Sequence, residues 1–143
     1  MGFKQIEVVP TQISPLQPSG KAHQIKVFQV SRTDTVSTLK AMLPAQASIT
    51  NVYLYGSTAS NAGTTATVTI TVTNNSGTIS TSGAVNVLAA GVGATNALLN
   101  MTNLPNIEPL PLLGDLKINA VYAETGTASS AGGPWKIAVE YVA

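Results

Sequence analysis

A run of alternating residues between positions 65 and 73 constrains the fold more than any other feature. Threonine occupies every odd position of this run, and Ala66, Val68, Ile70 and Val72 occupy the even positions. Because successive side chains of a β-strand point to opposite faces, this pattern predicts a strand with one buried and one outward face. The outward face is β-branched and polar but carries no charge, which raises the question of what it contacts.

The composition favours one weakly charged domain. The chain has 143 residues, of which only 9% are charged, and its net charge is +1. Soluble proteins ordinarily carry about 25% charged residues, and nucleic-acid binding needs clustered Lys and Arg. We therefore expect no nucleic-acid partner, and the absence of an apolar run of roughly 20 residues argues against a membrane partner. Such a surface is better suited to packing in an assembly than to keeping a monomer dispersed.

The residue types that usually carry catalysis or metal binding are scarce. The chain contains no cysteine and a single histidine, His23, while its six acidic residues are scattered. This excludes disulfides, thiolate metal sites and a cysteine nucleophile. No motif places a serine, histidine and acid together. We therefore expect a protein that is not an enzyme, with no catalytic, cofactor-binding or metal-binding residues and no cofactor.

Several other short segments are rich in β-branched and aromatic residues and predict further strands. These are residues 22–30, 49–55, 78–88 with an interruption at Gly83, 116–123 and 135–142.

Two segments are ambiguous. Residues 35–43 fit either a short helix capped by Asp34 or a strand, and we favour the strand because the surroundings are β throughout. Residues 94–101 fit a helical turn or a short strand.

The count of about eight strands, separated by Gly, Pro and Asn signals, predicts an all-β fold. No helical crossover joins the strands, so the sheets should be antiparallel. The connections are uneven in length, which favours Greek-key or jelly-roll wiring over a simple up-and-down barrel. We therefore predict a single antiparallel β-sandwich domain over residues 21–143 that is jelly-roll-like.

Two proline-rich segments are candidate partner-binding elements. Residues 1–20 contain three prolines and are predicted to form an extended N-terminal arm, and residues 104–113 contain three more. Their apolar side chains suggest contact with a neighbouring subunit, although a loosely ordered terminus is the alternative for the arm. The candidate contact residues are Ile6, Val8, Ile13, Leu16, Leu110 and Leu112.

Tyr53 and Tyr55 share one face of a predicted strand. Together with Trp135 they suggest a platform for a sugar ring, as in carbohydrate-binding modules. We favour the alternative that they line a contact between sheets or subunits, because sugar platforms usually need several aromatic rings free of neighbours.

Three stretches resemble small jelly-roll decoration or cement proteins of tailed bacteriophage heads. The chain has a core strand in 43–53, an Ala-Gly-Thr-Thr-Ala-Thr strand in 60–68 and an aromatic closing strand after a Gly-Gly turn in 130–142. The resemblance covers roughly residues 35–143, and tail-associated virion proteins share the pattern.

This resemblance implies a virion structural protein that binds the outside of a capsid and stiffens the shell against packaged DNA. Its partners would be the major capsid protein and itself, as a homodimer or homotrimer. It would be made in the host cytoplasm and reside on the capsid surface. The alternative hypothesis is a carbohydrate- or receptor-binding module of a tail fibre or adhesin.

Overall fold

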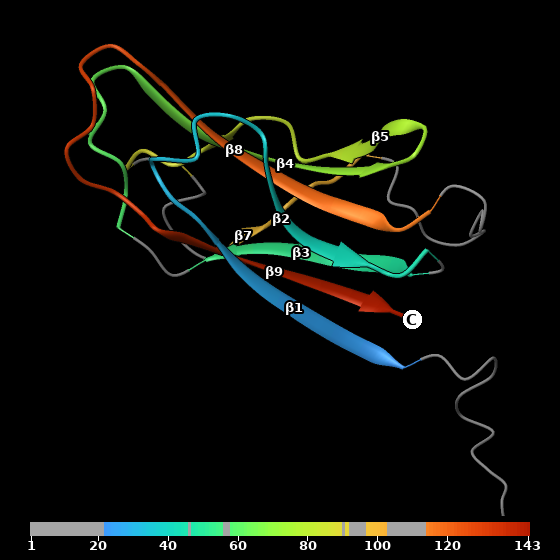
Figure 1. The fold of residues 1–143 in the computed structure, drawn as a ribbon. Helices are drawn as coiled ribbons and strands as arrows, with labels where there is room; N and C mark the ends of the chain where they lie inside the picture. The colour runs from blue at the N-terminus through green and yellow to red at the C-terminus, as the bar shows by residue number, and fades with distance from the viewer. Residues whose placement is uncertain (1–21, 46, 56–57, 90, 92–96, 103–113) are drawn as a thin grey trace, which may run out of the picture.

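The computed structural model describes residues 22–45, 47–55, 58–89, 91, 97–102 and 114–143. In these ranges the protein is all-β, and its strands form two antiparallel sheets that pack face to face (Figure 1). No helix in the described ranges could cross a membrane. The strands are β1 (His23–Val30), β2 (Thr38–Leu43), β3 (Ser48–Tyr55), β4 (Thr65–Asn74), β5 (Gly77–Thr81), β6 (Val85–Asn86), β7 (Ala97–Leu98), β8 (Leu116–Thr125) and β9 (Trp135–Val142).

The two sheets have different strand orders. Sheet A is four-stranded, in the order β1-β9-β3-β7. Sheet B is five-stranded, in the order β2-β8-β4-β5, and the short β6 also pairs with β4. In Figure 1, sheet B forms the upper layer and sheet A the lower one.

The wiring is that of a long hairpin rolled into a sandwich. The first strand in sequence pairs with the last, and the pairing continues inward along the chain. Thus β1 lies beside β9, β2 beside β8, β3 beside β7 and β4 beside β5, all antiparallel. The hairpin turns after Asn74, whose side-chain oxygen accepts a hydrogen bond from the Ser76 amide at 2.7 Å. Gly77 follows with a φ of 120°, a conformation that glycine adopts without steric cost. Successive pairs alternate between the two sheets, which is the jelly-roll arrangement and confirms the predicted fold class.

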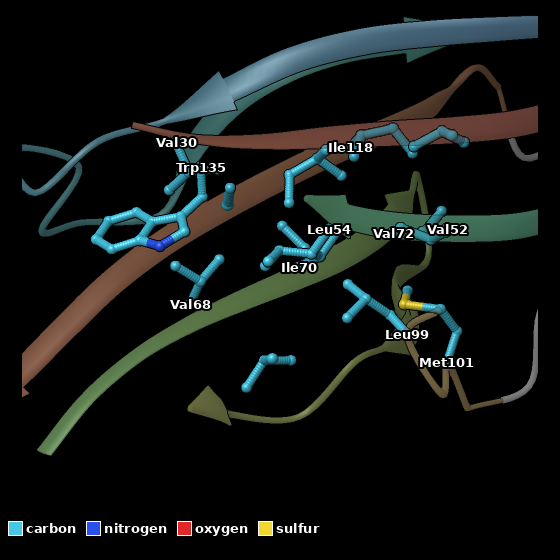
Figure 2. Close-up of a cluster of buried hydrophobic side chains, with 14 of the residues drawn as sticks. Val30, Val52, Leu54, Val68, Ile70, Val72, Leu99, Met101, Ile118 and Trp135 are labelled. Carbon is cyan, nitrogen blue, oxygen red and sulfur yellow. The ribbon is translucent and has the colours of Figure 1, made fainter. Parts of the chain in front are cut away.

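The core lies between the inner faces of the two sheets. The even positions of β4 (Ala66, Val68, Ile70 and Val72) are all buried, as their alternation predicts. In Figure 2, Trp135 lies at one end of the cluster, whereas Leu99 and Met101 lie at the other. Complete burial of a large apolar side chain contributes about 1.5–3 kcal/mol, so this layer supplies the main stabilisation of the fold.

The two ambiguous segments both form strands. Residues 38–43 are β2, and Asp34 does not cap a helix: its carboxylate accepts the Ser31 amide at 2.8 Å and pairs with the Lys40 ammonium at 2.7 Å. Burial acts to raise the pKa of Asp34, but the hydrogen bonds from Lys40 and Ser31 outweigh it and hold the pKa below its usual value. The segment 94–101 contributes β7.

The strand predicted over 78–88 is divided into two. Gly83 adopts a φ of 67° and separates β5 from β6, which adds a ninth strand to the eight that the sequence predicts. In β2 the register shifts between Leu39 and Ala41. This bulge leaves Leu39 and Met42 exposed on the outer side of sheet B.

Candidate interaction surfaces

The described residues hold no group of three or more His, Cys, Asp or Glu side chains that could bind a metal ion. The single histidine, His23, lies exposed at the start of β1. The features that could support a function are therefore surfaces. Three stand out: the outer face of sheet A, the outer face of sheet B, and one end of the sandwich.

The outer face of sheet A carries an apolar row that crosses all four strands. Val27 pairs with Ala138, Ala138 with Tyr53, and Tyr53 with Leu98. Residues directly opposite each other on neighbouring strands share a face of the sheet, so these four side chains form one row. Val27 is 55% exposed and Leu98 is 61% exposed. We refer to Val27, Ala138, Tyr53 and Leu98 as the apolar row.

Rows that each carry one charged residue flank the apolar row on both sides. On one side Gln29, Lys136 and Tyr55 lie in register, and on the other side Ile25, Glu140 and Asn51 do. Glu140 is held in place because its Oε1 accepts hydrogen bonds from Asn51 Nδ2 at 2.9 Å and from the Tyr53 hydroxyl at 3.3 Å. Burial and the Glu140 charge raise the pKa of the Tyr53 phenol, which therefore stays protonated.

A shallow groove lies on the same face. It has a volume of about 230 Å³ and is lined by Tyr53, Leu54, Tyr55, Ala97 and Ala138. Trp135 is not part of it, because this side chain is fully buried in the core and stacks on Tyr122, with ring centroids 5.3 Å apart. The suggested sugar platform of Tyr53, Tyr55 and Trp135 is therefore wrong: the tyrosines point outward and the tryptophan points inward.

The outer face of sheet B is mostly polar and almost uncharged, with Leu39 and Met42 of β2 as its exposed large apolar residues. The threonines of β4 lie between Thr125, Ala123, Val121, Asn119 and Lys117 of β8 on one side and β5 and β6 on the other. Four of the five threonines are half-buried, because neighbouring strands cover part of each side chain. The hydroxyl groups of Thr65 and Thr125 form a hydrogen bond of 2.7 Å. Lys117 is the one charged residue in register with these threonines among the described strands.

A hydrogen-bond network ties together the loops at one end of the sandwich. The Tyr122 hydroxyl donates to Glu124 and lies 2.8 Å from Ser60 Oγ, which is buried. The Glu124 carboxylate also accepts the Ser129 amide at 3.1 Å. Hydrogen bonds from Ser129 and Tyr122 lower the pKa of Glu124, against a smaller opposing effect of burial. We refer to Ser60, Tyr122, Glu124 and Ser129 as the loop network.

Arg32 extends this network to the loop between β1 and β2. Its guanidinium donates to the backbone oxygens of Ser129 at 2.8 Å, Ser130 at 3.3 Å and Gly132 at 3.3 Å. Gly132 also lies against Ser60, where a Cβ would come within 2.7 Å of the Ser60 Cα. These contacts fix the position of residues 126–134 against Arg32 and Ser60.

The six residues predicted to bind a partner belong to two segments of the chain. Ile6, Val8, Ile13 and Leu16 belong to residues 1–21, and Leu110 and Leu112 to residues 103–113, all outside the described residues. The expected extended arm lies outside them as well.

Sequence reasoning missed the exposed apolar residues of β1. Ile25 and Val27 lie on the outer face, while Phe28 and Val30 lie on the inner one. Since both sets are apolar, alternation alone does not indicate which set faces the core. The available signal was that the outer face of β1 carries no charged residue, which indicates that this face also makes contacts. It is formed by His23, Ile25, Val27 and Gln29.

The chain matches no protein-family model and no curated protein sequence. Among solved structures it is similar to a chain described as "Cyanophage Pam1 capsid asymmetric unit", with a TM-score of 0.55 and 19% sequence identity. The alignment covers 96% of this chain and 94% of that one. At this level of identity, the likeness shows a common fold over nearly the whole length of both chains.

Proposed function

We propose that this protein is a virion structural protein: a decoration, or cement, protein that binds the outer surface of a phage head and stabilises the shell. The observation that carries the proposal is the likeness to a chain of a phage capsid asymmetric unit, which spans 96% of this chain and 94% of that chain. The protein is proposed to act without catalysis.

The surface chemistry supports the same role. The outer face of sheet B is mostly polar and nearly free of charge, and sheet A adds the apolar row, which is exposed at its two ends, Val27 and Leu98. Surfaces of this kind bind through shape and hydrogen bonds, so their affinity depends little on salt. Many copies on a symmetric lattice need only moderate affinity each, provided that subunits and arms reinforce one another.

The proposed partners are the major capsid protein and further copies of this chain. The N-terminal arm, residues 1–20, is proposed to reach the capsid shell, with residues 104–113 as a second contact. Synthesis is proposed in the host cytoplasm and final location on the capsid surface.

The decisive test uses capsids assembled without this protein. The purified protein should co-sediment with them and raise the temperature at which they are disrupted. Binding should persist at about 1 M salt, where charges are screened beyond roughly 3 Å. Failure to bind such capsids under any salt condition contradicts the proposal.

A carbohydrate- or receptor-binding module is the second candidate, and the groove beside Tyr53 and Tyr55 is the observation in its favour. The groove is apolar and open, and it lacks a second exposed aromatic wall from Trp135, which is buried. Retention on host glycans without capsid binding would favour this candidate. Tyr55→Ala should then abolish retention while leaving the fold intact.

A further inference from the structure

The outer face of sheet A is self-complementary. The apolar row crosses the sheet through Ala138, the middle of β9, and Lys136 and Glu140 lie two residues away from Ala138 in opposite directions. Both charged residues point to the same outer face, because side chains at i, i+2 and i+4 of a strand share a side. The face therefore has an apolar centre line, a positive charge on one side of it and a negative charge on the other.

Neither charge has an oppositely charged partner within the described part of the chain. The ion pair found there joins Lys40 and Asp34, and Lys136 makes no ion pair with any described residue. Glu140 receives both of its side-chain hydrogen bonds at Oε1. Its Oε2 is accordingly still able to accept a proton donor from outside the subunit, while Asn51 and Tyr53 hold the carboxylate in a fixed orientation.

We propose that this face is the interface of a symmetric homodimer, with its two-fold axis running along the apolar row. Such an axis lies midway between the two facing sheets and runs perpendicular to their strands. It reverses the strand direction of the second copy but leaves each strand opposite the same strand of the first copy. Each row residue then meets the same row of the second copy, so that Val27, Ala138, Tyr53 and Leu98 are buried together. Strands of the two copies run antiparallel, about 10 Å apart, as in stacked sheets.

The same operation pairs the charges. Lys136 of the first copy lies opposite Glu140 of the second copy, and Glu140 of the first copy lies opposite Lys136 of the second. Two equivalent ion pairs therefore form around one apolar centre. This charge complementarity selects a second copy of the chain as the occupant of the face. A two-fold axis satisfies both charges at once, whereas a three-fold axis brings different faces of the subunits together.

This inference assigns a surface to the self-association named in the proposed function, and it is tested without capsids. Sedimentation velocity of the full chain at micromolar concentrations should show a dimer. Lys136→Glu and Glu140→Lys should each weaken self-association by at least about tenfold, because each places two like-charged pairs across the axis. An equimolar mixture of the two variants should recover a dimer, since every contact across the axis then joins opposite charges.

Two further variants guard against local misfolding and non-specific effects. The double variant Lys136→Glu/Glu140→Lys should dimerise like the unsubstituted chain, because the swap preserves complementarity. Val27→Lys should abolish the dimer through the apolar row alone, and the exposed position makes the fold tolerant of the change. Lys117→Glu, on the outer face of sheet B, is the matched control and should leave the dimer unchanged.

Three results would overturn the inference: a monomeric chain at high micromolar concentration, a dimer that survives Val27→Lys and both charge reversals, or single-charge variants that fail to associate when mixed. None of these results bears on capsid binding, so the dimer and the proposed function fail separately.

Discussion

At the scale of single residues, β4 separates core from surface position by position. Val68 and Ile70 are completely buried, whereas Thr69 between them is half-buried on the opposite face. The threonine side chains are covered in part by β8, β5 and β6 rather than standing free in water. The threonine side chains are therefore covered on their flanks by neighbouring strands, but nothing in the described residues covers them from outside the sheet.

Neighbouring substitutions on β4 should have opposite outcomes. Val68→Asp should unfold the protein, because burying an unpaired carboxylate costs several kcal/mol against a total stability of roughly 5–15 kcal/mol. Thr69→Lys should change stability by no more than about 0.5 kcal/mol, as is usual for surface positions. Urea unfolding followed by circular dichroism measures both effects. A folded Val68→Asp variant of normal stability would show that this face does not form the core.

The elements themselves were predictable wherever alternation is regular. The strands β4, β8 and β9 were expected within two residues of their observed bounds, since one face of each is consistently apolar. The strand β6 was predicted only as part of a longer strand over 78–88, because two residues cannot display a period. The loop network was not predictable: Ser60 and Tyr122 are separated by 62 positions, and only the pairing of β4 with β8 brings them together. The outward position of Ile25 and Val27 was hidden because Phe28 and Val30, on the inner face of β1, are equally apolar.

The loop network makes the stability of the loops dependent on pH in the acid range. The pKa of Glu124 is lowered in the folded state, so its contribution is fully present above about pH 4.5, its ordinary value, and is lost as the pH falls through the lower folded pKa. Glu124→Gln should remove part of this acid sensitivity. The urea midpoint of the variant should therefore differ from that of the unsubstituted chain more at pH 7 than at pH 2.

Tyr122→Phe is the companion variant, because it keeps the ring that stacks on Trp135 and removes the hydroxyl donor. It should reduce the same pH dependence. Equal differences at the two pH values for both variants would show that these hydrogen bonds do not favour the ionised carboxylate.

At the scale of the whole molecule, the two ends of the described chain meet. The Ala22 amide donates to the Ala143 oxygen at 2.8 Å, and the Ala143 amide donates to the Ala22 oxygen at 3.1 Å. The described chain thus begins and ends side by side, at the edge of sheet A. All buried residues of the described core come from position 30 or later.

Deletion of residues 1–18 should consequently leave a folded sandwich, with a thermal midpoint within a few degrees of the full chain. Capsid co-sedimentation should weaken by at least about tenfold if the arm supplies one of several linked contacts. Circular dichroism and the sedimentation assay measure the two effects. An unfolded product would show that the arm is part of the core, and unchanged capsid binding would remove it from the interface.

The pairing of β1 with β9 also orders events during synthesis. His23 leaves the ribosome 119 residues before Val142, the residue opposite it in the sheet. At the usual rate of elongation this interval is on the order of ten seconds. Throughout it, β1 lacks its neighbour and presents Ile25 and Val27 beside unpaired backbone groups, the features that promote aggregation. The pairing of β1 with β9 can form only after β9 has been synthesised, so the first of the described strands waits for the last one before it enters sheet A.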